Sequence, residues 1–553
     1  MSRYLNTTKS VCATGLTLLC LSSWAQNSAI ILKAMQDELK RSLTEIKYEG
    51  HDAPFYISYG ITDTREFNVY ATLGSLVQSG EYSNRGKSVR VLVGNYSFND
   101  ESLDNNLFSE PTANEIQLPI EDDYFGIRRA LWTTTDVVYK GAAQKYKKHQ
   151  STLNAQHKSL NDLPHRTFAK LPSVQIIDTS SNYTLAEEKW RDYCKQVSAV
   201  FLSFPAVESS DAMVNISYGT KYFVSSEGTI VAVPQMLSMF HCRAQVKTEA
   251  GEPIFDNITY YAKYPDEFPP LATALQEAKG LAEKLTAMRN ANALPEIYSG
   301  PVLFMGQAVA EAFASSLFSF RESLVASNAI LSANDFRPES STNLDSRVGK
   351  TIADNTLTVT AKPTLTAFQG IPLIGSYKVD DEGVIPPDVL TLVDRGVLRD
   401  LLNDRSLTRE DQAPNGHSNG PAVINLTVDN AVAIDSLKNR LITAAKHEGL
   451  EFAIIVRGHA QARSGMVNLW KVNLDTGREE LLRPAQLSDL TLKHLRRILG
   501  ASSDHEAYVA LTEEGNLASF IAPNALLLED VDLAPIKLPY LQQDKFVPHP
   551  LLK

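Results

Sequence analysis

Four strand-type segments that follow one another in the first half of the chain constrain its fold most. They span residues 212–224, 228–234, 239–247 and 254–262, and Gly or polar residues separate them. The stretch Ser225-Ser226-Glu227-Gly228 is one of these separators. Short polar turns join neighbouring antiparallel strands. The four segments therefore predict an antiparallel meander packed against helices.

Helical segments with one apolar face precede and follow this meander. Residues 28–48 place five apolar side chains at helical spacing in a stretch rich in Lys and Glu: Ile31, Met35, Leu39, Leu43 and Ile46. Similar patterns predict helices over residues 124–160, 185–201 and 269–288. Three further segments have the alternation of half-buried strands and would supply a sheet for the first helix to cover: 55–59, 66–78 and 87–95.

The second half of the chain is dominated by strands. Residues 290–295 indicate a linker, and helices are predicted only at 307–320 and 433–448. The predicted strands are 301–305, 356–362, 388–393, 397–400, 422–428, 451–459, 466–473 and 521–531. We expect an α+β protein of two domains. Residues 26–290 would form an antiparallel sheet flanked by helices, and residues 291–553 a β-rich, sheet-like or barrel-like domain with few helices.

The first 25 residues have the pattern of a signal peptide. Arg3 and Lys9 precede an apolar run at 11–21, and Ser23-Trp24-Ala25 places small residues where a signal peptidase acts. We expect cleavage after Ala25 and a periplasmic or secreted protein; the alternative is an uncleaved amphipathic helix. Because no later segment approaches the ~20 apolar residues that cross a bilayer, no membrane span is predicted.

The net charge and the cysteines of the exported chain bear on its partners and on a disulfide. Removing Arg3 and Lys9 with the signal peptide takes the formal net charge from −11 to −13, which argues against nucleic acid as a partner. Cys194 and Cys242 are the cysteines that remain. Both a disulfide between them and two buried thiols are compatible with the sequence.

Three segments of the second half, in order, resemble the TldD/PmbA family, which is related to metallopeptidases and includes modulator-of-gyrase-like proteins. The first is residues 300–304 with the helix that follows, and the last is residues 521–531. Between them, Asp380–Val384, Asp394–Leu398 and Leu402–Arg405 resemble the family's most distinctive stretch. The resemblance covers residues 300–553 well and the first domain only in outline.

The metal-binding motif that this resemblance implies is missing. The family's peptidases carry His-Glu-x-x-x-His on this helix and a later Cys, which hold a metal and activate its water. The matching positions here are Ala314, Ser315 and Ser319, and no Cys follows Cys242. Ala has no donor atom and a neutral hydroxyl is a poor zinc ligand. We therefore expect no metal and no cofactor. A serine nucleophile on this helix is not favoured either, because no His lies nearby.

The residues Asp380, Asp381, Glu382 and Gly383 are the candidate binding loop, for a cation or a substrate amine; the alternative is a solvated turn. The leading hypothesis is a peptide-binding or partner-supporting protein that holds extended peptide in a groove between domains by strand addition. The resemblance implies a homodimer, or a heterodimer with a TldD-type paralogue. Alternatives are an active metallopeptidase that binds zinc through Asp380, Asp381 or Glu382, and a structural component of an envelope assembly.

Overall fold

The computed structural model describes residues 29–536, except 104–116, 156, 158, 160–164, 179–182, 321, 327–343, 410, 462–464 and 514. The signal peptide predicted at residues 1–25 lies outside the described residues. No helix in the described part of the chain is long and apolar enough to cross a membrane.

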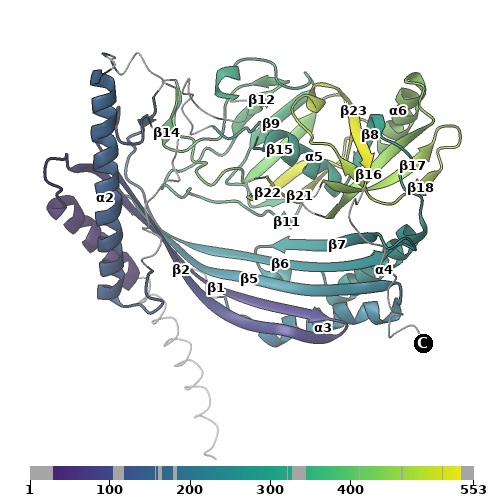
Figure 1. Cartoon of the computed structure of the whole chain (residues 1–553), viewed down its shortest axis with the longest axis horizontal. Helices are drawn as coiled ribbons and strands as arrows, with labels where there is room; N and C mark the ends of the chain where they lie inside the picture. The colour runs from purple at the N-terminus through teal and green to yellow at the C-terminus, as the bar shows by residue number, and fades with distance from the viewer. Residues whose placement is uncertain are drawn as a thin grey trace, which may run out of the picture.

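A six-stranded sheet forms the N-terminal half. Its order is β2-β1-β5-β6-β4, with β7 also paired to β6. All pairs are antiparallel except β4 with β6. The strands are β1 (Pro54–Thr72), β2 (Ser75–Val93), β4 (Gln175–Ile177), β5 (Val207–Ser225), β6 (Ile230–Lys247) and β7 (Pro253–Ala262). The predicted meander is confirmed as β5-β6-β7, and Figure 1 shows the long strands running the length of the molecule.

Two strand boundaries predicted in this half are wrong. The segments 55–59, 66–78 and 87–95 form only two strands, each of 19 residues, joined at Leu73-Gly74. Both turn residues have positive φ (46° and 82°), as a tight hairpin turn requires, but a leucine at the first position hides that turn in the sequence. The strand β6 also continues through Pro234. Along this edge of β6, β4 pairs only up to Ala232 and β7 only from Ser238. Pro234 lies between these two stretches, so its lack of an N–H group disrupts no pairing with β4 or β7.

The predicted helices of this half are confirmed, and they bury their apolar faces on the sheet. They occupy residues 29–45, α2 (Tyr124–Ala155), α3 (Glu187–Ala199) and α4 (Leu271–Asn290). The apolar residues of the first helix and of α2 share one core with β1 and β2, and those of α3 and α4 share another with β5 and β6. Cys194 and Cys242 lie in the second core as buried free thiols, and burial raises the pKa of Cys194 to about 12.

The C-terminal half contains two large sheets, so the predicted α+β fold class is confirmed. One has the order β13-β12-β9-β15-β22-β21. In the other, β16, β8, β23, β19 and β17 pair in a closed ring, to which β18 and β20 add at the outside. The strands are β8 (Tyr298–Met305), β9 (Leu357–Ala361), β12 (Leu390–Asp394), β13 (Val397–Leu398), β15 (Val423–Val428), β16 (Phe452–Gln461), β17 (Met466–Asn473), β18 (Glu479–Leu481), β19 (Ala485–Leu487), β20 (Ile498–Ala501), β21 (His505–Leu511), β22 (Leu517–Pro523) and β23 (Ala525–Pro535).

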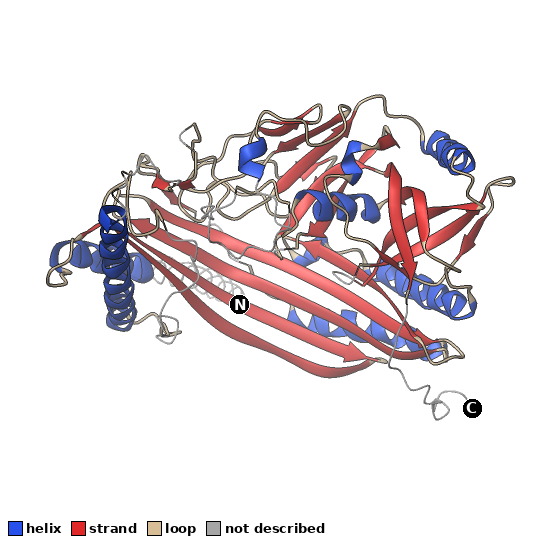
Figure 2. Ribbon diagram, turned by 45° about the horizontal axis from the view of Figure 1, so that its top comes forward, coloured by secondary structure: helices blue, strands red, loops and turns tan. Residues whose placement is uncertain are grey.

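The predicted strand 521–531 is wrong, because the chain changes sheets at Asn524. Residues before it belong to β22 and residues after it to β23. The Asn524 side-chain Nδ2 donates to Asp504 (2.7 Å), and the Asn524 main-chain carbonyl accepts the Gly306 N–H (2.8 Å). Gly306 immediately precedes α5 (Gln307–Leu317), the helix between the two C-terminal sheets, whereas α6 (Ile434–His447) lies outside (Figure 2).

Candidate functional site

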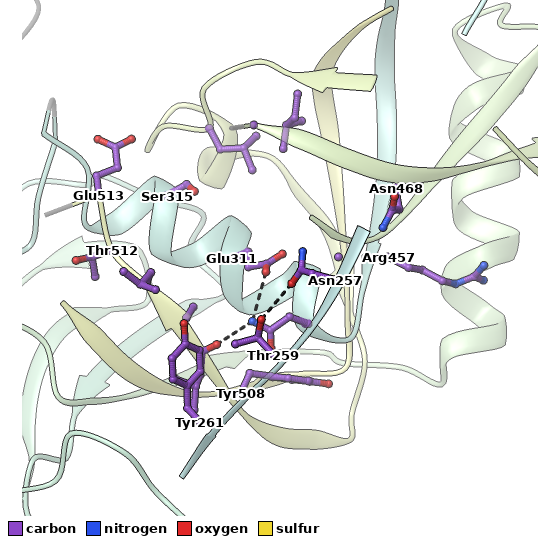
Figure 3. Close-up of a pocket in the computed structure, with 18 of the residues that line it drawn as sticks. Asn257, Thr259, Tyr261, Glu311, Ser315, Arg457, Asn468, Tyr508, Thr512 and Glu513 are labelled. Atoms are coloured by element: carbon purple, nitrogen blue, oxygen red, sulfur yellow. Dashed lines mark hydrogen bonds between the residues drawn. The ribbon is translucent and has the colours of Figure 1, made fainter. Parts of the chain in front are cut away.

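A cleft of about 1140 Å³ lies between the N-terminal sheet and the C-terminal half. One wall is β7, and the opposite wall is α5 with the end of β21 (Figure 3). The strands β16 and β17 supply Arg457 and Asn468 at one end. The cleft is therefore built from helices, strands and loops that are far apart in the sequence.

Helix α5 presents a polar stripe to this cleft. Gln307, Glu311 and Ser315 are spaced four residues apart, so they share one face of the helix, and all three line the cleft. The opposite face, with Val309 and Phe313, is fully buried in the C-terminal core. Gln307 donates from Nε2 to the Val509 carbonyl (2.8 Å), which ties the stripe to β21.

Strand β7 presents a polar stripe of its own and an unpaired edge. Asn257, Thr259 and Tyr261 alternate along it and line the cleft. Thr259 is held by His241 on β6 (2.9 Å) and donates to Asn257 (3.1 Å), and burial lowers the pKa of His241. The partner strand of β7 is β6, and no strand in the described part of the chain pairs with its other edge.

A buried polar cluster closes the end of the cleft near β17. Asp256 and Asn468 are each 1% exposed. The Asn468 Nδ2 donates to Asp256 (3.2 Å), and Lys284 of α4 forms an ion pair with the same carboxylate. The Asn468 Oδ1 accepts no hydrogen bond from the described residues. An acceptor buried without a donor is rare, and here it lines the cleft.

The positions that match the family's metal motif do not form a metal site. Ala314 is 1% exposed and lies in the core, whereas Ser315 and Ser319 line the cleft. The Ser319 Oγ accepts the Glu322 N–H and donates to the Glu322 carbonyl, both at 3.0 Å. One position has no donor atom and the others have neutral hydroxyls, so these side chains do not fit the metal of the family's peptidases. The described residues also contain no cluster of His, Cys, Asp or Glu that could hold a metal.

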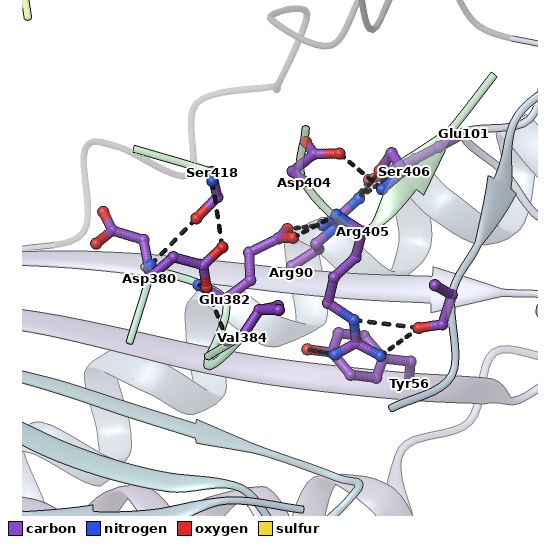
Figure 4. A network of polar contacts seen from close by, with 12 residues as sticks. Tyr56, Arg90, Glu101, Asp380, Glu382, Val384, Asp404, Arg405, Ser406 and Ser418 are labelled. Carbon is purple, nitrogen blue, oxygen red and sulfur yellow. Dashed lines mark hydrogen bonds and ion pairs between the residues drawn. The ribbon is translucent and has the colours of Figure 1, made fainter. Parts of the chain in front are cut away.

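The predicted binding loop lies away from the cleft, at the junction of β5 with the C-terminal half (Figure 4). Asp380 is 3% exposed, so it is not the solvated turn of the alternative interpretation. Its Oδ1 accepts the N–H groups of Glu382 (3.0 Å) and Val384 (2.8 Å), and its Oδ2 accepts that of Ser418 (3.2 Å). Burial, with the nearby Glu382 charge, raises the pKa of Asp380 to about 6.

The neighbouring residues of this loop are also engaged with the N-terminal sheet. Glu382 forms an ion pair with Arg90 of β2 and accepts the Arg405 N–H (2.9 Å). Asp381 forms an ion pair with Lys221 of β5. Gly383 has a φ of 80°, and a Cβ there would lie 2.7 Å from a methyl of Thr229. In this structure the loop therefore joins the two halves.

Several cleft residues were not predicted from the sequence: Asn257, Thr259, Tyr261, Glu311, Asn468 and Glu513. The alternation of polar residues in β7 is a signal that could have marked the first three. The others come together only through the pairing of distant strands, which no local pattern reports.

Comparison with known proteins agrees with this architecture. Residues 299–534 match the PmbA/TldA metallopeptidase C-terminal domain. No curated protein matches the chain in sequence.

Three solved structures share the fold. A proposed modulator of DNA gyrase from Thermotoga maritima is similar with a TM-score of 0.55 and 15% identity, over 87% of this chain and 96% of that chain. Another proposed modulator of DNA gyrase, from Bacteroides thetaiotaomicron, is similar with a TM-score of 0.55 and 12% identity, over 92% of this chain and 99% of that chain. TldE from Thermococcus kodakarensis is similar with a TM-score of 0.52 and 12% identity, over 91% of this chain and 100% of that chain. Residues 299–534 are therefore a C-terminal domain of the PmbA/TldA family, in agreement with the resemblance found in the sequence, and the chain as a whole shares the fold of these three structures.

Proposed function

We propose that this chain is an exported peptide-binding protein that holds an extended peptide against β7 and does not hydrolyse it through a metal. The observation that carries the proposal is the unpaired edge of β7, which opens into a cleft of about 1140 Å³. Known ligand pockets have volumes of roughly 300–1,000 Å³, so the cleft has room for a peptide segment.

Strand addition is the mode of binding that this geometry favours. An added strand forms main-chain hydrogen bonds with the exposed edge, and its side chains alternate between the two faces. The stripe on α5 then lies opposite β7, where it can contact every second side chain of the peptide. Because the affinity comes from the main chain, binding tolerates many peptide sequences.

The lost metal site is the reason to propose binding without hydrolysis. The family's peptidases use a metal to activate water, and Ala314, Ser315 and Ser319 cannot hold one. The chain would then act as a homodimer that only binds peptide, or in a heterodimer whose TldD-type paralogue supplies the catalysis.

Peptide binding is tested with a short labelled peptide rich in Thr and Val, which favour extended backbone. We expect binding in the micromolar range by fluorescence anisotropy, and unchanged binding after treatment with a chelator. The control is the same peptide N-methylated at alternate backbone amides, which cannot donate to β7 and should bind at least tenfold more weakly. Equal binding of both peptides would contradict strand addition, and chelator-sensitive cleavage would show an active metallopeptidase instead.

Export is supported by the sequence of the first 25 residues. We expect the protein isolated from the periplasmic or external fraction of its own cells to begin at Gln26. N-terminal sequencing checks this, and a chain that keeps residues 1–25 in the cytoplasmic fraction would contradict export.

A further inference from the structure

The cleft is closed at the end where β7 begins. The C-terminal half lies against this part of the strand: β16 contacts β7, and the Asn468 side chain of β17 donates to Asp256 (3.2 Å). Just before β7, Glu252 forms an ion pair with Arg483 (3.1 Å). A peptide strand added to the open edge of β7 therefore cannot continue past Asp256.

The opposite end of the cleft is open to solvent. Phe320 lines the cleft there and is 72% exposed, and its N–H donates to Glu513 (2.7 Å), which is exposed just beyond β21. Figure 3 shows Glu513 and Asn468 at opposite ends of the cleft. A peptide that fills the edge of β7 up to Asp256 therefore places one of its own two ends at Asp256.

The polar groups at the closed end have an acceptor to spare and no spare donor. Only the Nδ2 of an Asn can donate to a carboxylate, so the contact with Asp256 fixes the orientation of the Asn468 amide. The Asn468 side chain is 1% exposed, and its Oδ1 accepts no hydrogen bond from the described residues. The Lys284 ammonium is already paired with Asp256. A buried acceptor without a donor is unfavourable, and a ligand that donates to it removes that cost.

These groups favour the amino end of a peptide over its carboxyl end. A terminal ammonium, which is charged at neutral pH, can donate to the Asn468 Oδ1 while it lies beside the Asp256 carboxylate. A terminal carboxylate would place its own acceptors against the Asn468 Oδ1 and its negative charge beside Asp256. Since β7 runs from Pro253 to Ala262, a peptide held at Asp256 by its amino end runs parallel to β7.

We infer that the closed end of the cleft binds the free α-amino group of the peptide, with the Asn468 Oδ1 as acceptor and Asp256 as the opposite charge. The inference rests on the proposed peptide binding. It adds the substrate class: chains with a free amino end bind, whereas acetylated ends and internal segments bind more weakly. It also sets the register, because the bound amine fixes where the first residue of the peptide lies against β7.

Three Thr- and Val-rich peptides labelled at the carboxyl end test the inference by fluorescence anisotropy. The first has a free α-amino group and the second is N-acetylated. The third is N-acetylated and carries an added Lys next to the label, so its net charge equals that of the first. The wild-type protein should bind the first peptide about tenfold more tightly than the second, a ratio equal to ~1.4 kcal/mol. The third should bind as weakly as the second.

The variant Asn468→Ala tests the acceptor. It should bind the free and the acetylated peptide with affinities within about twofold of each other, and its binding of the acetylated peptide shows that it is folded. The matched control is Asn439→Ala, which removes an exposed amide of α6 that does not line the cleft. This control should keep the wild-type preference for the free amino end.

Each remaining outcome counts against a stated part of the account. Equal binding of the first two peptides by the wild-type protein would overturn the inference and leave the peptide-binding proposal standing. Tight binding of the third peptide would show attraction to charge in general and would also overturn the inference. A preference that survives in Asn468→Ala, or that Asn439→Ala also loses, would overturn the assignment of Asn468. Failure of all three peptides to bind would overturn both proposals.

Discussion

Replacing Arg405 with alanine is expected to lower the free energy of unfolding by about 3–5 kcal/mol, the range seen when one partner of a buried ion pair is removed. The guanidinium is 1% exposed and donates to Glu227 (2.7 Å) and to the Ala169 carbonyl (2.6 Å). It also lies over the ring of Phe168, 4.2 Å from its centroid. The substitution leaves the Glu227 carboxylate buried without its ion-pair partner, while the Tyr96 hydroxyl still donates to it (2.9 Å). Urea unfolding of both proteins measures the difference.

Two further variants separate this ion pair from a general effect of losing an arginine. Arg497→Ala removes an arginine that is 65% exposed and paired with Glu529, so it should change stability by less than about 1 kcal/mol. The double variant Arg405→Ala/Glu227→Gln should recover part of the loss, because it removes the orphaned charge. If the double variant loses as much free energy of unfolding as the two single variants lose together, the two residues are not coupled.

Asp380 is expected to make the wild-type protein less stable as the pH rises. The pKa of its carboxyl is about 6 in the folded protein against an ordinary 3.8, so the folded state holds its proton at a pH where the unfolded state has lost it. Stability therefore falls as the pH rises from below 3.8 to above 6. The variant Asp380→Asn does not titrate, and its stability relative to wild type should rise by about 2–3 kcal/mol between pH 4 and pH 8.

The hydrogen bonds of the variant differ from those of the wild type in a way that does not depend on pH. An Asn Oδ1 still accepts the Glu382 and Val384 N–H groups, whereas Nδ2 would face the Ser418 N–H. The control is Asp388→Asn, at an exposed carboxylate of the same segment. Urea unfolding across the pH range measures all three proteins, and parallel pH profiles for wild type and Asp380→Asn would contradict the raised pKa.

Much of the fold could be predicted from the sequence because its signals are local. The spacing of apolar residues predicts the helices over residues 29–45 and 434–447, and the polar turns between its strands predict the meander. The errors occur where tertiary context decides. Leu73 adopts positive φ because the long strands on both sides of it pair in register, and Asn524 breaks a continuous apolar run because two sheets diverge there.

The site was less accessible to sequence analysis. The sequence indicates a binding loop at Asp380 and Glu382, but it does not show that Asp380 is buried or that Glu382 pairs with Arg90 of the N-terminal half. Ser315 and Ser319 were singled out by the resemblance, and the structure places both in the cleft. The edge of β7 could not be predicted, because whether a strand is central or at an edge depends on the order of the whole sheet.

Hydrogen–deuterium exchange of the protein with and without the extended Thr- and Val-rich peptide tests the central claim most directly. If the peptide adds to the edge of β7, the amides of Asp256–Tyr261 that do not donate to β6 should exchange more slowly when it is bound. The amides of β2, the edge strand on the other side of the same sheet, should exchange at an unchanged rate. Unchanged exchange across Asp256–Tyr261 at saturating peptide, or protection confined to β2, would contradict the account.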